Sequence, residues 1–83
     1  MKTRVVPFPR ARNRTFVVRH ADRMADSSHP AAETYLVRQL EVQRETMLKR
    51  GVDAATAEKE VHALEVAIRA ELWRLVLTRG GAA

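Results

Sequence analysis

Apolar residues recur every three or four positions along most of this chain, which is the spacing of one face of an α-helix. The pattern covers three ranges, and we expect helices at about residues 14–25, 30–50 and 54–78. No range alternates apolar and polar residues for long enough to predict a strand. The pattern therefore predicts an all-α protein.

The ends of these ranges carry residues that start or stop helices. Asn13 is a favourable N-cap for the first helix, Pro30 falls in the first turn of the second, and Asp53 caps the third. Gly51 stops the second helix and leaves only a short link to the third. A short link predicts an antiparallel hairpin of these two helices, on which the first helix packs.

The third helix carries two apolar stripes about 150° apart by the helical period. The first stripe is Ala57, Val61, Leu64, Ile68, Leu72 and Leu75, and the second is Val66, Ala70, Trp73 and Leu77. The first stripe faces the second helix. The second stripe meets either the first helix or another subunit, so Trp73 is either a core residue or an interface anchor.

Self-association is expected because 83 residues without a cysteine form a small core with no disulfide to support it. We therefore expect a homodimer that forms a helical bundle. The candidate interface residues are Phe8, Val66, Trp73 and Leu77.

The N-terminal segment differs from the rest of the chain in pattern. Pro7 and Pro9 exclude a helix there and favour extended geometry. We expect an extended arm over residues 1–12, one helical domain over residues 13–79 and a frayed tail over residues 80–83.

The positive charge of the chain is concentrated in its first twenty residues. Residues 1–20 hold six basic side chains and no acidic one, whereas residues 21–83 hold nine basic and ten acidic ones. Basic arms with aromatic residues bind the phosphates of nucleic acids. The candidate nucleic-acid-binding residues are Lys2, Arg4, Arg10, Arg12, Arg14 and Arg19. An acidic protein surface, strand addition through Val5 and Val6, or a tail that only solubilises the protein are the alternatives.

Residues that carry chemistry are few, and none forms a catalytic or metal-binding pattern. His20, His29 and His62 are the only histidines, and none is spaced from another as helical zinc ligands are. His62 has Glu58 and Glu65 one turn away, which we interpret as a solvated contact. We therefore predict no catalytic residue, no metal and no cofactor, and the sequence favours binding over catalysis.

No stretch of the chain has the length and hydropathy of a membrane span, and no apolar signal-peptide core follows the first basic residues. We expect a cytoplasmic protein. Pro7 and Pro9 also disfavour the amphipathic helix of an organellar transit peptide.

Four segments carry a resemblance to a known family. They are Val5-Val6-Pro7-Phe8-Pro9, Phe16-Val17-Val18-Arg19-His20-Ala21, Tyr35-Leu36-Val37-Arg38-Gln39-Leu40 and Ala67-Ile68-Arg69-Ala70-Glu71-Leu72-Trp73-Arg74. Together they resemble an uncharacterised family of small basic proteins found in alphaproteobacteria and their mobile elements. The resemblance implies a bacterial protein and no site residue or activity.

Two hypotheses about function follow. The first is a small regulator associated with nucleic acid through its basic arm. The second is a protein-interaction module, such as an inhibitor or antiactivator, that binds its partner through the apolar faces of the second and third helices.

Overall fold

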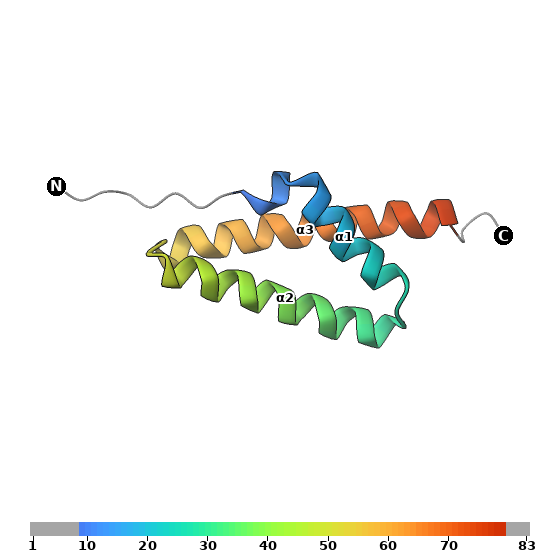
Figure 1. Ribbon diagram of the computed structural model, residues 1–83, viewed down its shortest axis with the longest axis horizontal. Coiled ribbons are helices and arrows are strands. Elements are labelled where there is room, and N and C mark those ends of the chain that lie inside the picture. Colours follow the sequence, from blue (N-terminus) through green and yellow to red (C-terminus); the bar gives the residue numbers. More distant parts are fainter. Residues whose placement is uncertain (1–8, 80–83) are drawn as a thin grey trace.

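The computed structural model describes residues 9–79, and every regular element in this range is helical (Figure 1). A short 3₁₀ helix, η1 (Arg10–Arg12), leads into α1 (Arg14–Ala25), which is followed by α2 (His29–Lys49) and α3 (Ala54–Arg79). The prediction of an all-α protein is confirmed for these residues. The expected ends of the three α-helices differ from the observed ones by at most one residue.

The prediction of an extended arm through residue 12 is wrong for its last residues. The backbone N–H of Arg12 donates to the carbonyl of Pro9 at 3.0 Å, and that of Asn13 donates to the carbonyl of Arg10 at 3.0 Å. These bonds close the turn of η1, which packs against α3. Pro9 has no N–H of its own, but its carbonyl is free to accept one. The arm residues 1–8 lie outside the described part of the chain.

Polar side chains cap all three α-helices as the sequence predicts for α1 and α3. Asn13 Oδ1 accepts from the N–H of Phe16 at 3.0 Å, and Asp53 Oδ2 accepts from that of Thr56 at 3.0 Å. At α2 the cap is Ser28, whose Oγ accepts from the N–H of Ala31 at 3.3 Å. Each such cap typically stabilises a helix by about 1 kcal/mol.

The chain reverses between α2 and α3 through a glycine in the left-handed region. Gly51 has a φ of 95°, which costs glycine nothing but is unfavourable for a residue with a Cβ. Its N–H donates to the carbonyl of Leu48, and the N–H of Val52 donates to that of Met47. These two bonds satisfy carbonyls at the end of α2, and Val52 is buried beneath the turn.

The core lies where the three helices meet. The helices α2 and α3 run side by side in opposite directions, and α1 crosses in contact with both (Figure 1). The cluster of buried side chains consists of Val17, Ala21, Met24, Ala32, Leu36, Leu40, Val61, Leu64 and Ile68. Burial of a side chain the size of leucine contributes about 1.5 to 3 kcal/mol. Within residues 9–79, no helix combines the length and apolar character that a membrane span requires.

Two bidentate ion pairs join α2 to α3 outside this core. Arg69 Nη1 and Nη2 each lie 2.8 Å from an oxygen of Glu33, and Arg69 Nε also donates to Glu65 at 3.1 Å. Arg44 Nε donates to Glu58 at 2.6 Å. The hydrogen bond from Arg69 lowers the pKa of Glu33, and that from Arg44 lowers the pKa of Glu58. Both carboxylates therefore stay ionised at neutral pH.

Candidate nucleic-acid interface

The structure places four of the six arginine and lysine candidates, and these four do not form one cluster. Arg10 lies over the ring of Phe16, with its guanidinium carbon 4.9 Å from the ring centroid. Arg12 and Arg14 line a common groove, whereas Arg19 is exposed further along α1. Lys2 and Arg4 lie outside the described residues, as does the interface candidate Phe8.

The groove of about 380 Å³ runs between the start of α1 and the outer side of α3. It is lined by Ala11, Arg12, Arg14, Val17, Ala67, Ala70, Glu71 and Arg74. Small apolar side chains thus form much of its lining, and three guanidinium groups surround it. Arginine donors around a shallow groove can bind the oxygens of a phosphate.

Glu71 orients two of these arginines from beneath. It is only 4% exposed, although it lies on a surface helix of a small protein. Its Oε1 lies 3.0 Å from Arg14 Nη2, and its Oε2 accepts from Arg74 Nε at 3.0 Å. The hydrogen bond from Arg74 and the positive charge of Arg14 hold the pKa of Glu71 below its usual range, against the effect of burial.

The arginines keep most of their surface in water in spite of these contacts. Arg14 is 70% exposed and Arg74 is 54% exposed. A guanidinium group has five N–H donors, so one that contacts a carboxylate retains donors for a second anion. The buried carboxylate therefore positions Arg14 and Arg74 without occupying them fully.

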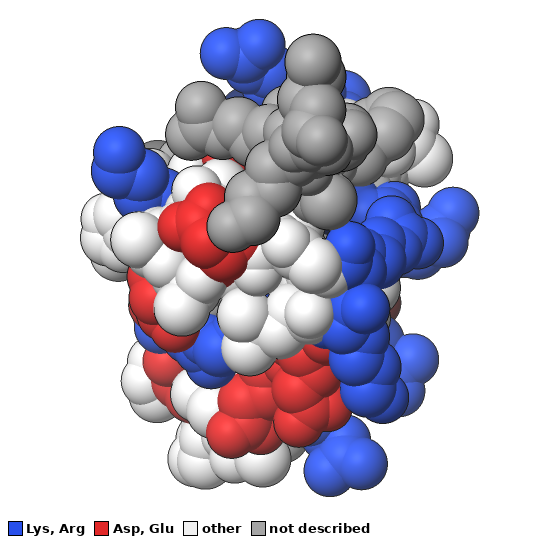
Figure 2. Space-filling view, turned by 90° about the vertical axis from the view of Figure 1, so that its left-hand side faces the viewer, with Lys and Arg blue, Asp and Glu red and all other residues white. Residues whose placement is uncertain are grey.

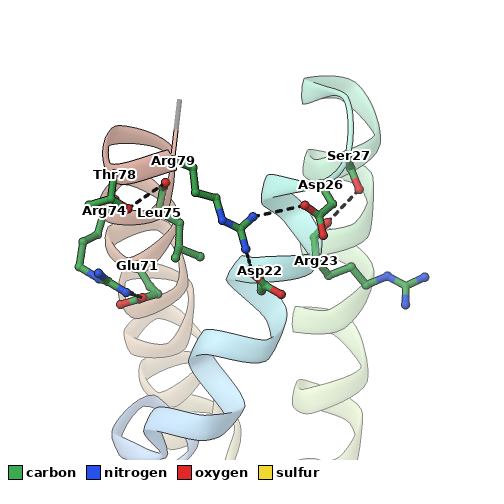
Figure 3. A network of polar contacts seen from close by, with 9 residues as sticks. All are labelled: Asp22, Arg23, Asp26, Ser27, Glu71, Arg74, Leu75, Thr78 and Arg79. Atoms are coloured by element: carbon green, nitrogen blue, oxygen red, sulfur yellow. Dashed lines mark hydrogen bonds and ion pairs between the residues drawn. The ribbon is translucent and has the colours of Figure 1, made fainter. Parts of the chain in front are cut away.

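A second network pairs the two acidic residues at the end of α1 with one arginine of α3 (Figure 3). Arg79, at the end of α3, reaches back to Asp22 and to Asp26, and its Nη1 lies 3.3 Å from Asp26 Oδ1. Asp22 and Asp26 are the only acidic residues of α1 and of the turn that follows it. Arg23 points away from this network in Figure 3, and its guanidinium lies over the ring of Tyr35 at 5.2 Å.

His20 links α1 to α2 in the interior of the molecule. Its Nδ1 lies 2.5 Å from the hydroxyl oxygen of Tyr35, and its ring meets Phe16 edge-on with centroids 4.4 Å apart. Burial lowers the pKa of His20, and the charges of Arg19 and Arg23 lower it further. The imidazole is therefore neutral at pH 7 and serves as a polar core residue.

The remaining interface candidates lie on the surface of α3. Val66 is 53% exposed, Trp73 is 67% exposed and Leu77 is 61% exposed. The helix α1 packs on a different face of α3, so the interpretation of Trp73 as a core residue beneath the first helix is wrong. Beside Trp73, a groove of about 240 Å³ lies between α2 and α3, lined by His29, Ala32, Glu33, Arg69, Leu72, Trp73 and Val76.

The histidine and carboxylate group around His62 does not assemble. Glu58 contacts Arg44 and Glu65 contacts Arg69, while His62 is exposed. Within the part of the chain that the structure describes, no group of histidine and acidic residues is arranged to hold a metal ion.

The sequence reasoning missed three residues of these networks. Glu71 lies three residues after Ile68, a spacing that places it beside the buried stripe of α3, and this was the available signal. The contacts of Tyr35 with His20 and of Arg79 with Asp22 join residues distant in the chain, and a single sequence carries no signal for them.

The fold and the groove define a small three-helix protein with an arginine-lined surface. The chain belongs to a family of unknown function (DUF6074), whose family model matches residues 1–83. The resemblance to a family of unknown function is thereby confirmed. Neither a curated protein nor a solved structure matches the chain.

Proposed function

We propose that this protein is a small, non-catalytic regulatory protein that binds nucleic acid through the basic surface formed by η1, α1 and the adjoining part of α3. The observation that supports the proposal most directly is the groove in which Arg12, Arg14 and Arg74 surround the buried carboxylate of Glu71. Phosphates of a nucleic-acid backbone are the anions that a row of exposed arginines recognises.

The distribution of the other charges supports the same surface. Arg79 pairs with Asp22 of α1 and with Asp26 at its C-cap, so one cation offsets part of the acidic charge at the end of this helix. Figure 2, which views the molecule from the end where α2 meets α3, shows Lys and Arg down most of one side, with others at the top and on the opposite side, and Asp and Glu mainly on that opposite side and at the base. Such a separation favours one orientation of the protein on a polyanion.

The arm residues Lys2 and Arg4 extend this surface in our proposal. With Arg10, Arg12, Arg14 and Arg19 they make six basic groups, and six phosphate contacts give a salt slope of about −5. That slope corresponds to a loss of roughly a thousandfold in affinity between about 50 and 200 mM salt.

The test is a mobility-shift titration of a duplex oligonucleotide over this range of salt. We expect Arg12→Ala to weaken binding and to reduce the salt slope by about 1. The matched control is Arg50→Ala, which removes the same charge at an exposed position in the turn after α2. Binding that does not depend on salt, or equal effects of the two variants, would contradict the proposal. Capture of an acidic protein in place of the duplex would show that the same surface serves another partner.

A second candidate function is a protein-interaction module, such as an inhibitor, that uses the apolar faces of α2 and α3. The observation that favours it is the exposed Trp73 beside the groove between these helices. Exposed apolar patches with a large aromatic residue mark interaction sites. A complex captured from a nuclease-treated lysate should then be lost in Trp73→Ala and retained when residues 1–8 are deleted.

The proposal includes self-association of the chain, with α2 and α3 as the antiparallel hairpin of each subunit. A homodimer doubles the basic surface without adding a domain. Two linked surfaces bind one polyanion more tightly than a single surface does, because the second contact becomes intramolecular.

A further inference from the structure

The outer face of α3 carries a second helix-packing surface that the chain itself leaves uncovered. Its residues are Ala63, Val66, Ala70, Trp73 and Leu77, all of which are exposed. They follow one another at intervals of 3, 4, 3 and 4 residues, which is the spacing of positions a and d in a heptad repeat. We call these five residues the α3 seam.

From this seam, and resting on the proposed self-association, we infer that α3 pairs with α3 of a second copy in the antiparallel direction. The pairing places Trp73 against the partner's Ala63 and Val66 against the partner's Ala70. A twofold axis passes between the two helices near Ile68, so every contact is made twice.

The sizes of the side chains support this register. Antiparallel pairs bring an a position of one helix against a d position of the other, and here each such layer joins a large side chain to an alanine. Alternating large and small residues across an interface fill it without voids or clashes. In a parallel pair Trp73 would instead meet its own copy, and each alanine would face an alanine.

The charges beside the seam support the same direction. Glu60 and Arg74 flank the seam on one side, and the antiparallel register brings Glu60 near the partner's Arg74. Glu60 forms no ion pair with any residue from 9 to 79. Arg74 contacts Glu71 through Nε and Nη2, but it is 54% exposed and keeps further N–H donors for a second carboxylate. A parallel pair would bring Arg69 near the partner's Arg74, and two cations would then repel each other.

In the antiparallel pair Arg69 lies near the partner's Arg69, and two guanidinium groups repel each other. The carboxylates that already contact Arg69 reduce this repulsion. Glu33 holds it with two hydrogen bonds of 2.8 Å and Glu65 with one of 3.1 Å. Each cation thus approaches the axis with two carboxylates around it. Lys59, one interval before Ala63, falls opposite the partner's Leu77, where its aliphatic stem can pack.

The energetics are favourable because α3 is already folded in each subunit. The paired segment from Lys59 to Leu77 spans about 27 Å, a length at which a free peptide would still have to order its backbone on association. Here the core of each subunit has already ordered the helix, so association orders only surface side chains.

The experiment measures oligomeric state by size-exclusion chromatography with light scattering on the full chain. We expect the wild type to be a dimer, and Trp73→Ala to raise the dissociation constant by at least about 30-fold while leaving the helical circular dichroism unchanged. Ala63→Trp should have a similar effect, because it places a tryptophan against the partner's Trp73. Ala31→Trp on the exposed start of α2 is the control and should remain dimeric.

The decisive variant combines both changes. Ala63→Trp with Trp73→Ala restores a large residue against a small one in the antiparallel register and should recover the dimer. A monomeric wild type, or a double variant that stays monomeric while folded, would overturn the inference. Ala70 and Arg74 belong both to this pairing and to the arginine groove, but the substituted residues Ala63 and Trp73 do not line that groove. Failure of the pairing in these variants is therefore distinguishable from failure of nucleic-acid binding, which Arg12→Ala tests.

Discussion

The Nδ1 atom of His20 on α1 lies 2.5 Å from the hydroxyl oxygen of Tyr35 on α2, and this is the polar contact that joins the two helices inside the core. Two arginine side chains lie close to this pair. Arg10 of η1 stacks on Phe16 beside the imidazole, and Arg23 of α1 stacks on Tyr35. The arrangement favours a neutral imidazole, because protonation would add a positive charge among arginines in a buried site.

The stability of the protein is therefore expected to depend on the protonation of His20. Its folded pKa is lowered from the ordinary value of 6.5, so the unfolded chain binds the proton more readily. The contribution of neutral His20 to the free energy of unfolding is fully present above pH 6.5. It is lost as the pH falls below that value towards the folded pKa. Thermal unfolding of the wild type should show this decline, whereas His20→Gln should show a flatter curve in the same window. Equal slopes would contradict the assignment.

Removal of the Tyr35 hydroxyl tests the same contact at fixed pH. Tyr35→Phe leaves the ring in place and deprives His20 of its partner, so the free energy of unfolding should fall by about 1 kcal/mol at neutral pH. Chemical denaturation measures the change. In the combined variant with His20→Gln the two effects should not add, because both remove one interaction.

Two adjacent residues of α2 provide a direct test of the packing. Leu36 is 0% exposed, whereas Val37 is 53% exposed. We expect Leu36→Ala to lower the free energy of unfolding by about 2 to 5 kcal/mol, because it leaves a cavity between the helices. Val37→Ala should change it by less than about 0.5 kcal/mol. Urea denaturation measures the free energy of unfolding of both variants. Similar losses for the two would mean that α2 does not direct Leu36 into the core and Val37 into solvent.

Glu71 is expected to stabilise the fold only while it is ionised. Its pKa is lowered by Arg74 and Arg14, so its contribution is present above the ordinary value of 4.5 and is lost as the pH falls through the lower folded pKa. Glu71→Gln should therefore unfold at a lower temperature than the wild type at neutral pH. The two proteins should converge in strong acid, and a gap that persists there would assign the effect to packing.

We expect the loss of Arg79 to weaken nucleic-acid binding more than the loss of an arginine that forms no ion pair. Arg79→Ala leaves Asp22 and Asp26 near the end of α1 without the arginine that contacts them. Arg50→Ala removes one charge and leaves no carboxylate without an ion-pair partner among residues 9–79. A mobility-shift titration should show weaker binding for Arg79→Ala than for Arg50→Ala. Stability should change by less than about 1 kcal/mol in either variant, because the ion pairs of Arg79 are on the surface and Arg50 is an exposed turn residue. A larger effect of Arg50→Ala would argue against the α1 surface.

The sequence predicts the helices well because their signals are local. Asn13 and Asp53 cap the helices through residues three positions away, and the buried stripe of α3 appears in the spacing of residues such as Leu64 and Ile68. The end of the arm was predicted less well. Proline excludes an α-helix at Pro9, but it does not exclude the single 3₁₀ turn that the carbonyl of Pro9 begins.

The candidate site was predicted only in part, because its geometry depends on contacts between distant residues. Arg12 was expected on an extended arm and Arg14 at the start of the first helix, whereas the structure places both at a groove over Glu71 of α3. The helical spacing placed Trp73 on a second face of α3 but could not say whether α1 covers that face. Which face a helix gives to its neighbour depends on the crossing of whole helices, and the sequence alone does not specify that crossing.

The exposure of Trp73 has a practical consequence, because it is the only tryptophan in the chain. The tryptophan emission of the protein therefore reports on a single place, the outer face of α3. In water the emission of an indole lies at long wavelength, and it moves to shorter wavelength when a partner covers the ring. The emission wavelength of the unlabelled protein, recorded as the protein is diluted, thus shows whether a partner covers Trp73, without a dye or a mutation.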